Sequence, residues 1–363
     1  MGGEALSVSV INMTRGMPPV EVFPVEDIVA ASTAALRNDP HVLLQYGRAP
    51  GYKPLRELMG GWYGVGADQV MVGNSSLELL DFIARTHLGP GKRAFVESPS
   101  YDRAITTLRR AGAEVVGIPL AEDGVDLETL ELEIARGQPA LLYVVTDFQN
   151  PMGTTTSLAK RQRIAELALE HGFWVVEDAP YRRLRYWGEE VPTIYSLAPA
   201  RVMHLSSFSK VLAPGLRLGY LVSTPEVVVE LSAFAVDTYI GPVFPTQGLV
   251  YEYCRAGLLE PNIEKLKTLY APRLEATLDA LTQHFRGSTW SHPEGGFFVG
   301  VTLPDGASIG RLLQRADQAG VKLSDGRGFY PNAAGGDRFL RIPFCSITPE
   351  DLHAGIARLA ALL

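Results

Sequence analysis

The amino-acid sequence predicts an α/β fold, in which a large domain has a mostly parallel sheet flanked by helices and a smaller domain is of the α+β class. Two observations predict it. The middle of the chain alternates short apolar runs with longer amphipathic segments, which is typical of strands joined by helices in a parallel sheet. The last part of the chain departs from that alternation, which indicates a second unit.

The strand candidates are short apolar runs bounded by turn residues. They span residues 94–96, 141–145, 173–176, 202–205 and 218–222. Because helical segments lie between them, we expect them to pair mostly in parallel.

A helix is predicted between the second and third of these strands. Ser157 can cap its start and Gly172 can end it. Its buried stripe is formed by Leu158, Ile164, Leu167 and Ala168.

The C-terminal part has its own pattern. A strand is predicted over residues 295–301 and a helix over 309–319, followed by a strand pair near Val321 and Phe339 and a helix over 349–362. The first forty or so residues lie outside the regular alternation, so we expect them to join this smaller unit. The predicted division is a large domain of residues 41–254 and a small domain of residues 1–40 and 255–363.

The composition excludes several classes of function. The formal net charge is −7 without an offsetting run of Lys and Arg, so no nucleic-acid partner is expected. The two cysteines form no Cys-x-x-Cys pair, and the seven histidines are scattered, so we expect reduced thiols and no metal site. No apolar run approaches the roughly 20 residues of a membrane span.

The N-terminus has no signal-peptide pattern, and Leu6 occupies the position where myristoylation requires Ser or Thr. We therefore expect a soluble, cytoplasmic protein with no membrane partner.

Three polar segments follow predicted strands. They are Asn150-Pro151-Met152-Gly153, Asp178-Ala179-Pro180-Tyr181, and Ser207-Phe208-Ser209-Lys210 with Arg217 beyond it. Their spacing is that of one strand–helix–strand unit, about 30 residues. Since ligands of an open α/β sheet bind at the carboxyl ends of its strands, we expect the three segments to meet in one cleft.

This set of groups suits pyridoxal 5′-phosphate (PLP). A desolvated Lys210 amine can form a Schiff base with the aldehyde of PLP. Asp178 suits the pyridine nitrogen, whose protonation makes the ring an electron sink. Asn150 and Tyr181 suit the phenolic oxygen. Ser207 and Arg217 suit the phosphate.

A second phosphate-binding element is predicted at Gly73-Asn74-Ser75-Ser76-Leu77, where a glycine turn opens a helix over residues 77–86. Free backbone N–H groups and the helix dipole favour a phosphate there.

Several further motifs stand in a fixed order along the chain. They are Tyr46-Gly47 with Gly51 and Leu55-Arg56, Phe148-Gln149-Asn150-Pro151-x-Gly153, the stretch from Ser207 to Tyr220, Pro293-x-Gly295-Gly296-Phe297, and Leu340-Arg341-Ile342-Pro343-Phe344. In the order and spacing of these motifs, the chain resembles the fold-type I, class I/II PLP-dependent aminotransferases over nearly its whole length. It is most similar to the branch of 2-aminoadipate and kynurenine aminotransferases and the aminotransferase-like domains of MocR-type regulators.

The resemblance implies further roles. Arg341 would grip the substrate α-carboxylate, and Tyr101 would stack on the cofactor ring. Asn74 and Ser75 match the phosphate-binding turn. Tyr46 would reach the phosphate of the neighbouring subunit, which implies a homodimer with active sites at the interface.

Three points concern the substrate end of the site. Gly16 matches a glycine of the N-terminal segment that closes over the substrate. Arg15 beside it is a candidate for the second carboxylate of a dicarboxylic substrate, with a solvated arginine as the alternative. Arg327 stands where this branch often has a small residue, which would affect substrate choice.

The predicted reaction moves an amino group from an amino acid to a 2-oxo acid by ping-pong kinetics, with Lys210 as general base and 2-oxoglutarate as the expected acceptor. Two alternatives stay open. One is another PLP reaction on the same fold, such as β-elimination. The other is a PLP- or amino-acid-sensing domain. The pattern begins near residue 11, which leaves no room for the basic DNA-binding module of the MocR-type regulators.

Overall fold

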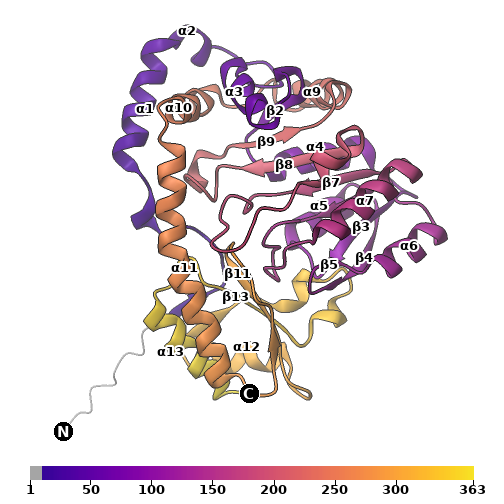
Figure 1. The fold of residues 1–363 in the computed structure, drawn as a ribbon, viewed down its shortest axis with the longest axis vertical. Coiled ribbons are helices and arrows are strands. Elements are labelled where there is room, and N and C mark those ends of the chain that lie inside the picture. Colours follow the sequence, from indigo (N-terminus) through magenta and orange to yellow (C-terminus); the bar gives the residue numbers. More distant parts are fainter. Residues whose placement is uncertain (1–9) are drawn as a thin grey trace.

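Residues 10–363 are described by a computed structural model (Figure 1). The expectations about a signal peptide and about Leu6 lie outside the described residues. In the described part of the chain, no helix is long and apolar enough to cross a membrane.

The central feature is an eight-stranded sheet with the order β2-β9-β8-β7-β6-β3-β4-β5. Pairing is parallel from β8 through β7, β6 and β3 to β4. Antiparallel pairing joins β9 to β8 and β2, and β5 to β4. The strands are β2 (Val70–Gly73), β3 (Arg93–Ser98), β4 (Glu114–Ala121), β5 (Gly124–Val125), β6 (Leu141–Val144), β7 (Trp174–Asp178), β8 (Val202–Ser207) and β9 (Gly219–Val222).

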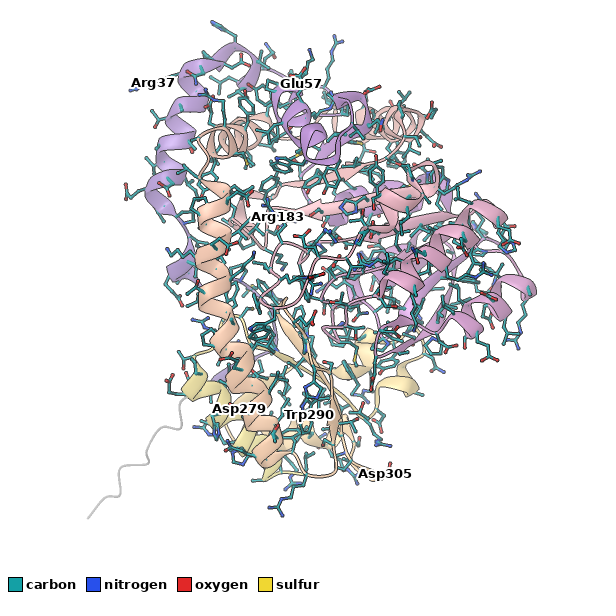
Figure 2. All side chains as sticks on the ribbon, viewed as in Figure 1. Arg37, Glu57, Arg183, Asp279, Trp290 and Asp305 are labelled. Atoms are coloured by element: carbon teal, nitrogen blue, oxygen red, sulfur yellow. The ribbon has the colours of Figure 1, made fainter. Side chains whose placement is uncertain are left out.

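Helices flank this sheet, and side chains fill the space between the layers, where the core lies (Figure 2). The helices of this part of the chain are α3 (Lys53–Tyr63), α4 (Ser76–His87), α5 (Asp102–Arg110), α6 (Leu127–Arg136), α7 (Leu158–His171), α8 (Ile194–Leu197), α9 (Pro225–Tyr239) and α10 (Phe244–Arg255). Two more, α1 (Val25–Asn38) and α2 (Pro40–Leu43), lie next to α10 in Figure 1.

The long helix α11 (Leu259–His284) runs from this region down to the C-terminal elements, where it packs against α13 (Pro349–Ala360) (Figure 1). There, β11 (Phe298–Thr302) pairs antiparallel with β10 (Thr289–Trp290) and β13 (Phe339–Pro343). Helix α12 (Ile309–Gln318) leads to β12 (Val321–Leu323), which pairs in parallel with β1 (Ile11–Met13). The division into domains at residues 40 and 254 stays a prediction.

The predicted α/β class is confirmed, and so is the helix over 157–172. The hydroxyl of Ser157 accepts a hydrogen bond from the Lys160 amide, and Gly172 closes the helix with φ +75°. Leu158, however, is 41% exposed, so its place in the buried stripe is wrong. It is the first residue of the helix.

Two strand predictions need correction. The strands near Val321 and Phe339 do not pair with each other, because the first pairs with the N-terminal β1 and the second with β11. The strand predicted over 295–301 begins at Phe298. Gly296 before it has φ +74°, which is left-handed backbone that does not continue a strand.

Candidate active site

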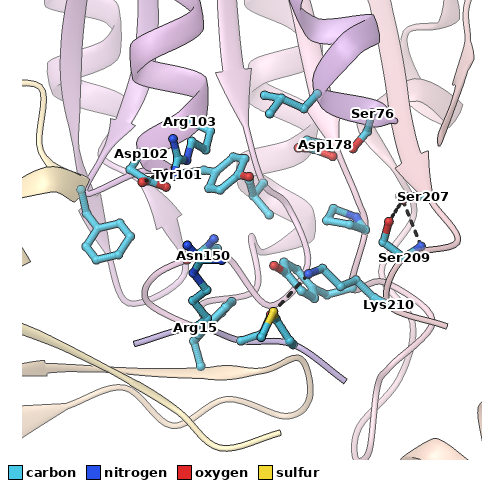
Figure 3. A pocket seen from close by; sticks show the side chains of 18 of the residues that line it. Arg15, Ser76, Tyr101, Asp102, Arg103, Asn150, Asp178, Ser207, Ser209 and Lys210 are labelled. Atoms are coloured by element: carbon cyan, nitrogen blue, oxygen red, sulfur yellow. Dashed lines mark hydrogen bonds and ion pairs between the residues drawn. The ribbon is translucent and has the colours of Figure 1, made fainter. Parts of the chain in front are cut away.

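A cavity of about 540 Å³ lies at the carboxyl ends of β6, β7 and β8. Asn150 follows β6, Asp178 ends β7, and Ser207 ends β8 with Lys210 shortly after it. The expectation that the three polar segments meet at one sheet edge is confirmed. The predicted site residues that line this cavity are Arg15, Gly16, Ser75, Tyr101, Asn150, Asp178, Tyr181, Ser207, Lys210, Arg217 and Arg341. Figure 3 labels six of them, namely Arg15, Tyr101, Asn150, Asp178, Ser207 and Lys210.

The structure does not bring Asn74 and Tyr46 to the cavity. Both the backbone amide and the side-chain amide of Asn74 donate to Glu78, and its Oδ1 accepts from the Val243 amide at 3.0 Å. Asn74 therefore supports the turn from behind. Tyr46 is 80% exposed on a different surface, next to Gly47 and Phe244. Arg327 pairs with Asp325, which lines the cavity.

Asp178 is a buried carboxylate with one unused oxygen. Its Oδ2 accepts a hydrogen bond from the Tyr143 hydroxyl at 2.7 Å, whereas its buried Oδ1 has no partner among the described residues. Burial raises the pKa of Asp178 to about 6, although Tyr143, His204 and Lys210 act in the opposite direction. A buried acceptor without a donor is costly unless a ligand supplies one. Oδ1 is therefore placed to accept an N–H from a bound group.

Lys210 is an amine held in surroundings that favour its neutral form. Burial lowers its pKa below the ordinary lysine value. Its Nζ lies 5.7 Å from the ring centre of Tyr181 and 5.5 Å from that of Phe297, and it donates to the Gly16 carbonyl at 3.4 Å. A neutral amine is the nucleophilic form of lysine, so Lys210 is suited to attack an aldehyde.

The guanidinium of Arg341 is held by two aromatic rings. Its carbon Cζ lies 4.6 Å from the ring centres of both Phe298 and Phe329. Nη1 donates to Asn150 Oδ1 at 3.0 Å, and Nη2 donates to the Thr14 carbonyl at 2.8 Å. Nε is buried without a partner among residues 10–363. This arrangement presents a planar fork, which suits recognition of a carboxylate.

An anion site is formed where α4 begins. Ser75 caps the helix by accepting from the Glu78 amide at 3.0 Å, and Ser75, Ser76 and Leu77 at the start of the helix line the cavity. Ser76 and Ser209 line the cavity close to Ser207 (Figure 3). Arg217, in left-handed backbone with φ 48°, adds a positive charge. These donors suit a phosphate.

Sequence reasoning missed several cavity residues. Tyr143, which donates a hydrogen bond to Asp178, lies within the apolar strand run 141–145, and its one polar group is the only sequence signal for this contact. Phe329, which covers Arg341, ends the short 3-10 helix Gly326–Phe329 between β12 and β13 and has no motif of its own. Asp102 and Arg103 also line the cavity and come from the start of α5.

The donors and acceptors of this cavity fit PLP. A nucleophilic amine, a carboxylate with an unused oxygen and a helix N-terminus with hydroxyls match its aldehyde, ring nitrogen and phosphate. The fold and the site together define a PLP-dependent enzyme.

Comparisons with known proteins place the chain within a family. Residues 8–359 match the family "Aminotransferase class I and II". The chain is 33% identical over 359 residues to a 2-aminoadipate transaminase of Thermus thermophilus, covering 98% of this chain and 90% of that protein. It is 34% identical over 366 residues to an aromatic-amino-acid aminotransferase of Thermococcus litoralis, covering 97% and 87% of the two chains.

A solved structure supports the same assignment. The α-aminoadipate aminotransferase of Thermus thermophilus, complexed with N-(5′-phosphopyridoxyl)-L-leucine, superposes with a TM-score of 0.91. The two chains are 33% identical, and the match covers 98% of this chain and 92% of the other. The chain belongs to the class I and II aminotransferases. It is a PLP-dependent transferase of amino groups with the fold of type I PLP enzymes.

Gly219 offers a test of the anion site. A Cβ at Gly219 would lie 2.1 Å from the Ser76 backbone nitrogen, whereas a Cβ at Gly215, in the short 3-10 helix Pro214–Leu216 that precedes β9, would meet nothing within 4 Å. Gly219→Ala must therefore displace the turn that opens α4. We expect PLP to bind roughly 10- to 100-fold more weakly, the equivalent of one lost hydrogen bond to a charged group. Absorbance titration with PLP measures this, with Gly215→Ala as the matched control. Equal affinities in the two variants would contradict the anion site.

Proposed function

We propose that the enzyme moves an amino group from an amino acid to 2-oxoglutarate by a ping-pong mechanism, with Lys210 and Asp178 as its central catalytic pair. The observation that carries this proposal is the meeting of a buried amine and a carboxylate with an unused oxygen in one cavity. When bound, PLP would supply the electron sink for the reaction at the substrate α-carbon.

Each side chain has a proposed task. Lys210 holds the cofactor aldehyde and, once released, moves a proton from the substrate α-carbon. Asp178 keeps the pyridine nitrogen protonated, while Asn150 and Tyr181 bind the phenolic oxygen. Tyr101 packs on the ring. The phosphate is held by Ser75, Ser207 and Arg217, with Asn74 supporting the turn.

The substrate carboxylate is assigned to Arg341. Asn150 and the Thr14 carbonyl orient its guanidinium, so a carboxylate binds to a group already held in place. Gly16 lies in the same N-terminal segment, and a Cβ there would lie 2.4 Å from the Phe298 ring. Glycine at this position therefore allows the segment to lie close over the substrate site.

A dicarboxylic substrate is supported by the charges around the cavity. Asp102 lies within ion-pair distance of Arg103, and Asp325 pairs with Arg327. Arg15, in contrast, has no carboxylate partner within residues 10–363 and lies apart from Ser76 and Ser207 (Figure 3). The phosphate and the α-carboxylate already have their arginines. Arg15 is thus the cation left for a second carboxylate, as in glutamate and 2-oxoglutarate.

We also infer a homodimer. The loop after α2 and the loop before α10 expose apolar side chains, including Leu44 (71% exposed), Ile240 (54%) and Val243 (55%). They lie beside a groove of about 610 Å³ that Tyr46 helps to line. Val243 donates to Asn74 behind the phosphate turn, so this surface adjoins the active site. An exposed apolar patch of this kind suits a second copy of the chain.

Both cysteines are free thiols, which supports a cytoplasmic location.

The reaction itself is tested by mixing the PLP-loaded enzyme with glutamate alone and measuring 2-oxoglutarate. We expect release of one equivalent per site without any acceptor, followed by amino transfer when a second 2-oxo acid is added. Lys210→Ala abolishes this release, and Lys92→Ala, which changes an exposed lysine, does not. Release of ammonia and pyruvate from serine, which carries a β-leaving group, would indicate β-elimination instead. Amino-acid binding without any product would support the sensing alternative.

Arg15 is tested by comparing substrates with one and two carboxylates. In Arg15→Ala we expect the KM for 2-oxoglutarate to rise roughly 10- to 100-fold, because one charged hydrogen-bond donor is lost, while the KM for pyruvate is unchanged. Arg103→Ala serves as the comparison, since its cation has a carboxylate neighbour. An unchanged KM for 2-oxoglutarate in Arg15→Ala would rule out this role.

The dimer surface is tested by sedimentation. We expect the wild-type protein to sediment as a dimer and the double variant Leu44→Glu with Val243→Glu as a monomer of 39.5 kDa, because two buried charges oppose association. Leu132→Glu, at a position 53% exposed on α6, is the matched control. A double variant that remains dimeric would place the interface elsewhere.

A further inference from the structure

We propose that Tyr143 is a positioning residue for the cofactor, because it holds Asp178 so that one chosen carboxylate oxygen meets the pyridine nitrogen. This inference rests on the proposed role of Asp178 and adds a residue to it. Tyr143 would act through Asp178 and not by contact with the reacting atoms.

The geometry begins with strand register. Tyr143 of β6 pairs with Val176 of β7, and Asp178 follows two residues later on the same strand. Side chains two residues apart in a strand share a face, so Tyr143 and Asp178 lie on the same side of the sheet. The hydroxyl of Tyr143 donates to Oδ2 of Asp178 at 2.7 Å. The remaining oxygen, Oδ1, is the buried acceptor that has no partner within residues 10–363.

Tyr143 is suited to this task because it remains a donor. It is fully buried, and burial, followed by the nearby charge of Asp178, raises its pKa well above the ordinary tyrosine value. The hydroxyl therefore keeps its proton. A free carboxylate can rotate and offer either oxygen. With Oδ2 engaged, rotation would break a hydrogen bond to a charged group, so Oδ1 is the oxygen left for the ring nitrogen.

The other groups around Asp178 do not replace this bond. His204 of β8 and Lys210 favour its charged form through space, and Glu97 of β3, Tyr101 and Tyr181 also interact with it electrostatically. Within the described residues, the Tyr143 hydroxyl is the hydrogen-bond donor that reaches the Asp178 side chain. Without it, both carboxylate oxygens would lack a protein donor.

The test is a double-mutant cycle on cofactor affinity. PLP dissociation constants are measured by absorbance titration for the wild type, Tyr143→Phe, Asp178→Ala and the double variant. We expect Tyr143→Phe to weaken PLP binding about tenfold in the wild-type background, the loss of one hydrogen bond to a charged group. In the Asp178→Ala background, we expect Tyr143→Phe to have no further effect, because its partner is gone.

A cofactor analogue locates the effect. In 1-deaza-pyridoxal phosphate, carbon replaces the ring nitrogen, so binding of the analogue should be equal in wild type and Tyr143→Phe. That equality would also show that the variant is folded. Tyr253→Phe is the matched control, because Tyr253 is a buried tyrosine of α10 whose hydroxyl has no partner in the described part of the chain. We expect it to leave PLP affinity unchanged.

The outcomes separate this inference from the proposal beneath it. If Asp178→Ala does not weaken PLP binding, Asp178 does not bind the pyridine nitrogen, and both the proposed role of Asp178 and this inference are overturned. If Asp178→Ala weakens binding but Tyr143→Phe does not, only the inference is overturned. If Tyr143→Phe weakens PLP equally in both backgrounds, or weakens the analogue as much as PLP, Tyr143 acts by direct contact or on the fold, and the inference is again overturned.

Discussion

The position of the loop that carries Asn150 depends on a buried arginine, Arg161, which does not itself line the active-site cavity. Arg161 of α7 is fully buried, and its guanidinium forms a bidentate pair with Asp147. Its Nε and Nη2 also donate to the carbonyls of Thr156 and Thr146, both at 2.8 Å. These contacts tie both ends of the loop from residue 146 to 156 to one rigid group. A buried ion pair of this quality repays its desolvation only when its remaining hydrogen bonds are made, as they are here. The loop is thereby held closed, with Asn150 at its tip facing Arg341.

Two neighbouring acids of β7 differ in how completely their carboxylate oxygens are hydrogen-bonded. Glu177 and Asp178 point to opposite faces. Burial disfavours the charged form of Glu177, but His204 and the amides of Ile194 and Tyr195 donate to it, and its pKa falls to about 2. Asp178 has one donor and an unused oxygen, and its pKa is about 6. The hydrogen bonds of Glu177 link β7 to α8 and β8. Asp178, with one oxygen unbonded, is available for a ligand.

The N-terminal segment of residues 14–17 lines the active-site cavity. The Thr14 carbonyl accepts from Arg341 and from Ser324, and the Gly16 carbonyl accepts from Lys210. The groups assigned to the substrate and the cofactor therefore also hold this segment, which is anchored by the pairing of β1 with β12. A carboxylate bound to Arg341, as proposed, would share the donors of Arg341 with the Thr14 carbonyl. Arg15, the residue proposed for a second carboxylate, follows Thr14 in the same segment.

The sequence by itself determined the strand–helix alternation, the carboxyl-end position of Asn150, Asp178 and Lys210, and the cofactor they suit. Such inferences succeed because periodicity, turn residues and motif spacing are local properties of the chain. Only the tertiary structure decided the rest. The partner of β12 is β1, with Ile11 paired to Val321, 321 − 11 = 310 residues apart along the chain. The hydrogen bond from Tyr143 to Asp178 joins adjacent strands, and Phe329 covers Arg341 from the short 3-10 helix Gly326–Phe329. Each of these is a long-range contact between residues with no shared local pattern, so the physical reason for it appears only when the sheet and the smaller unit are packed together.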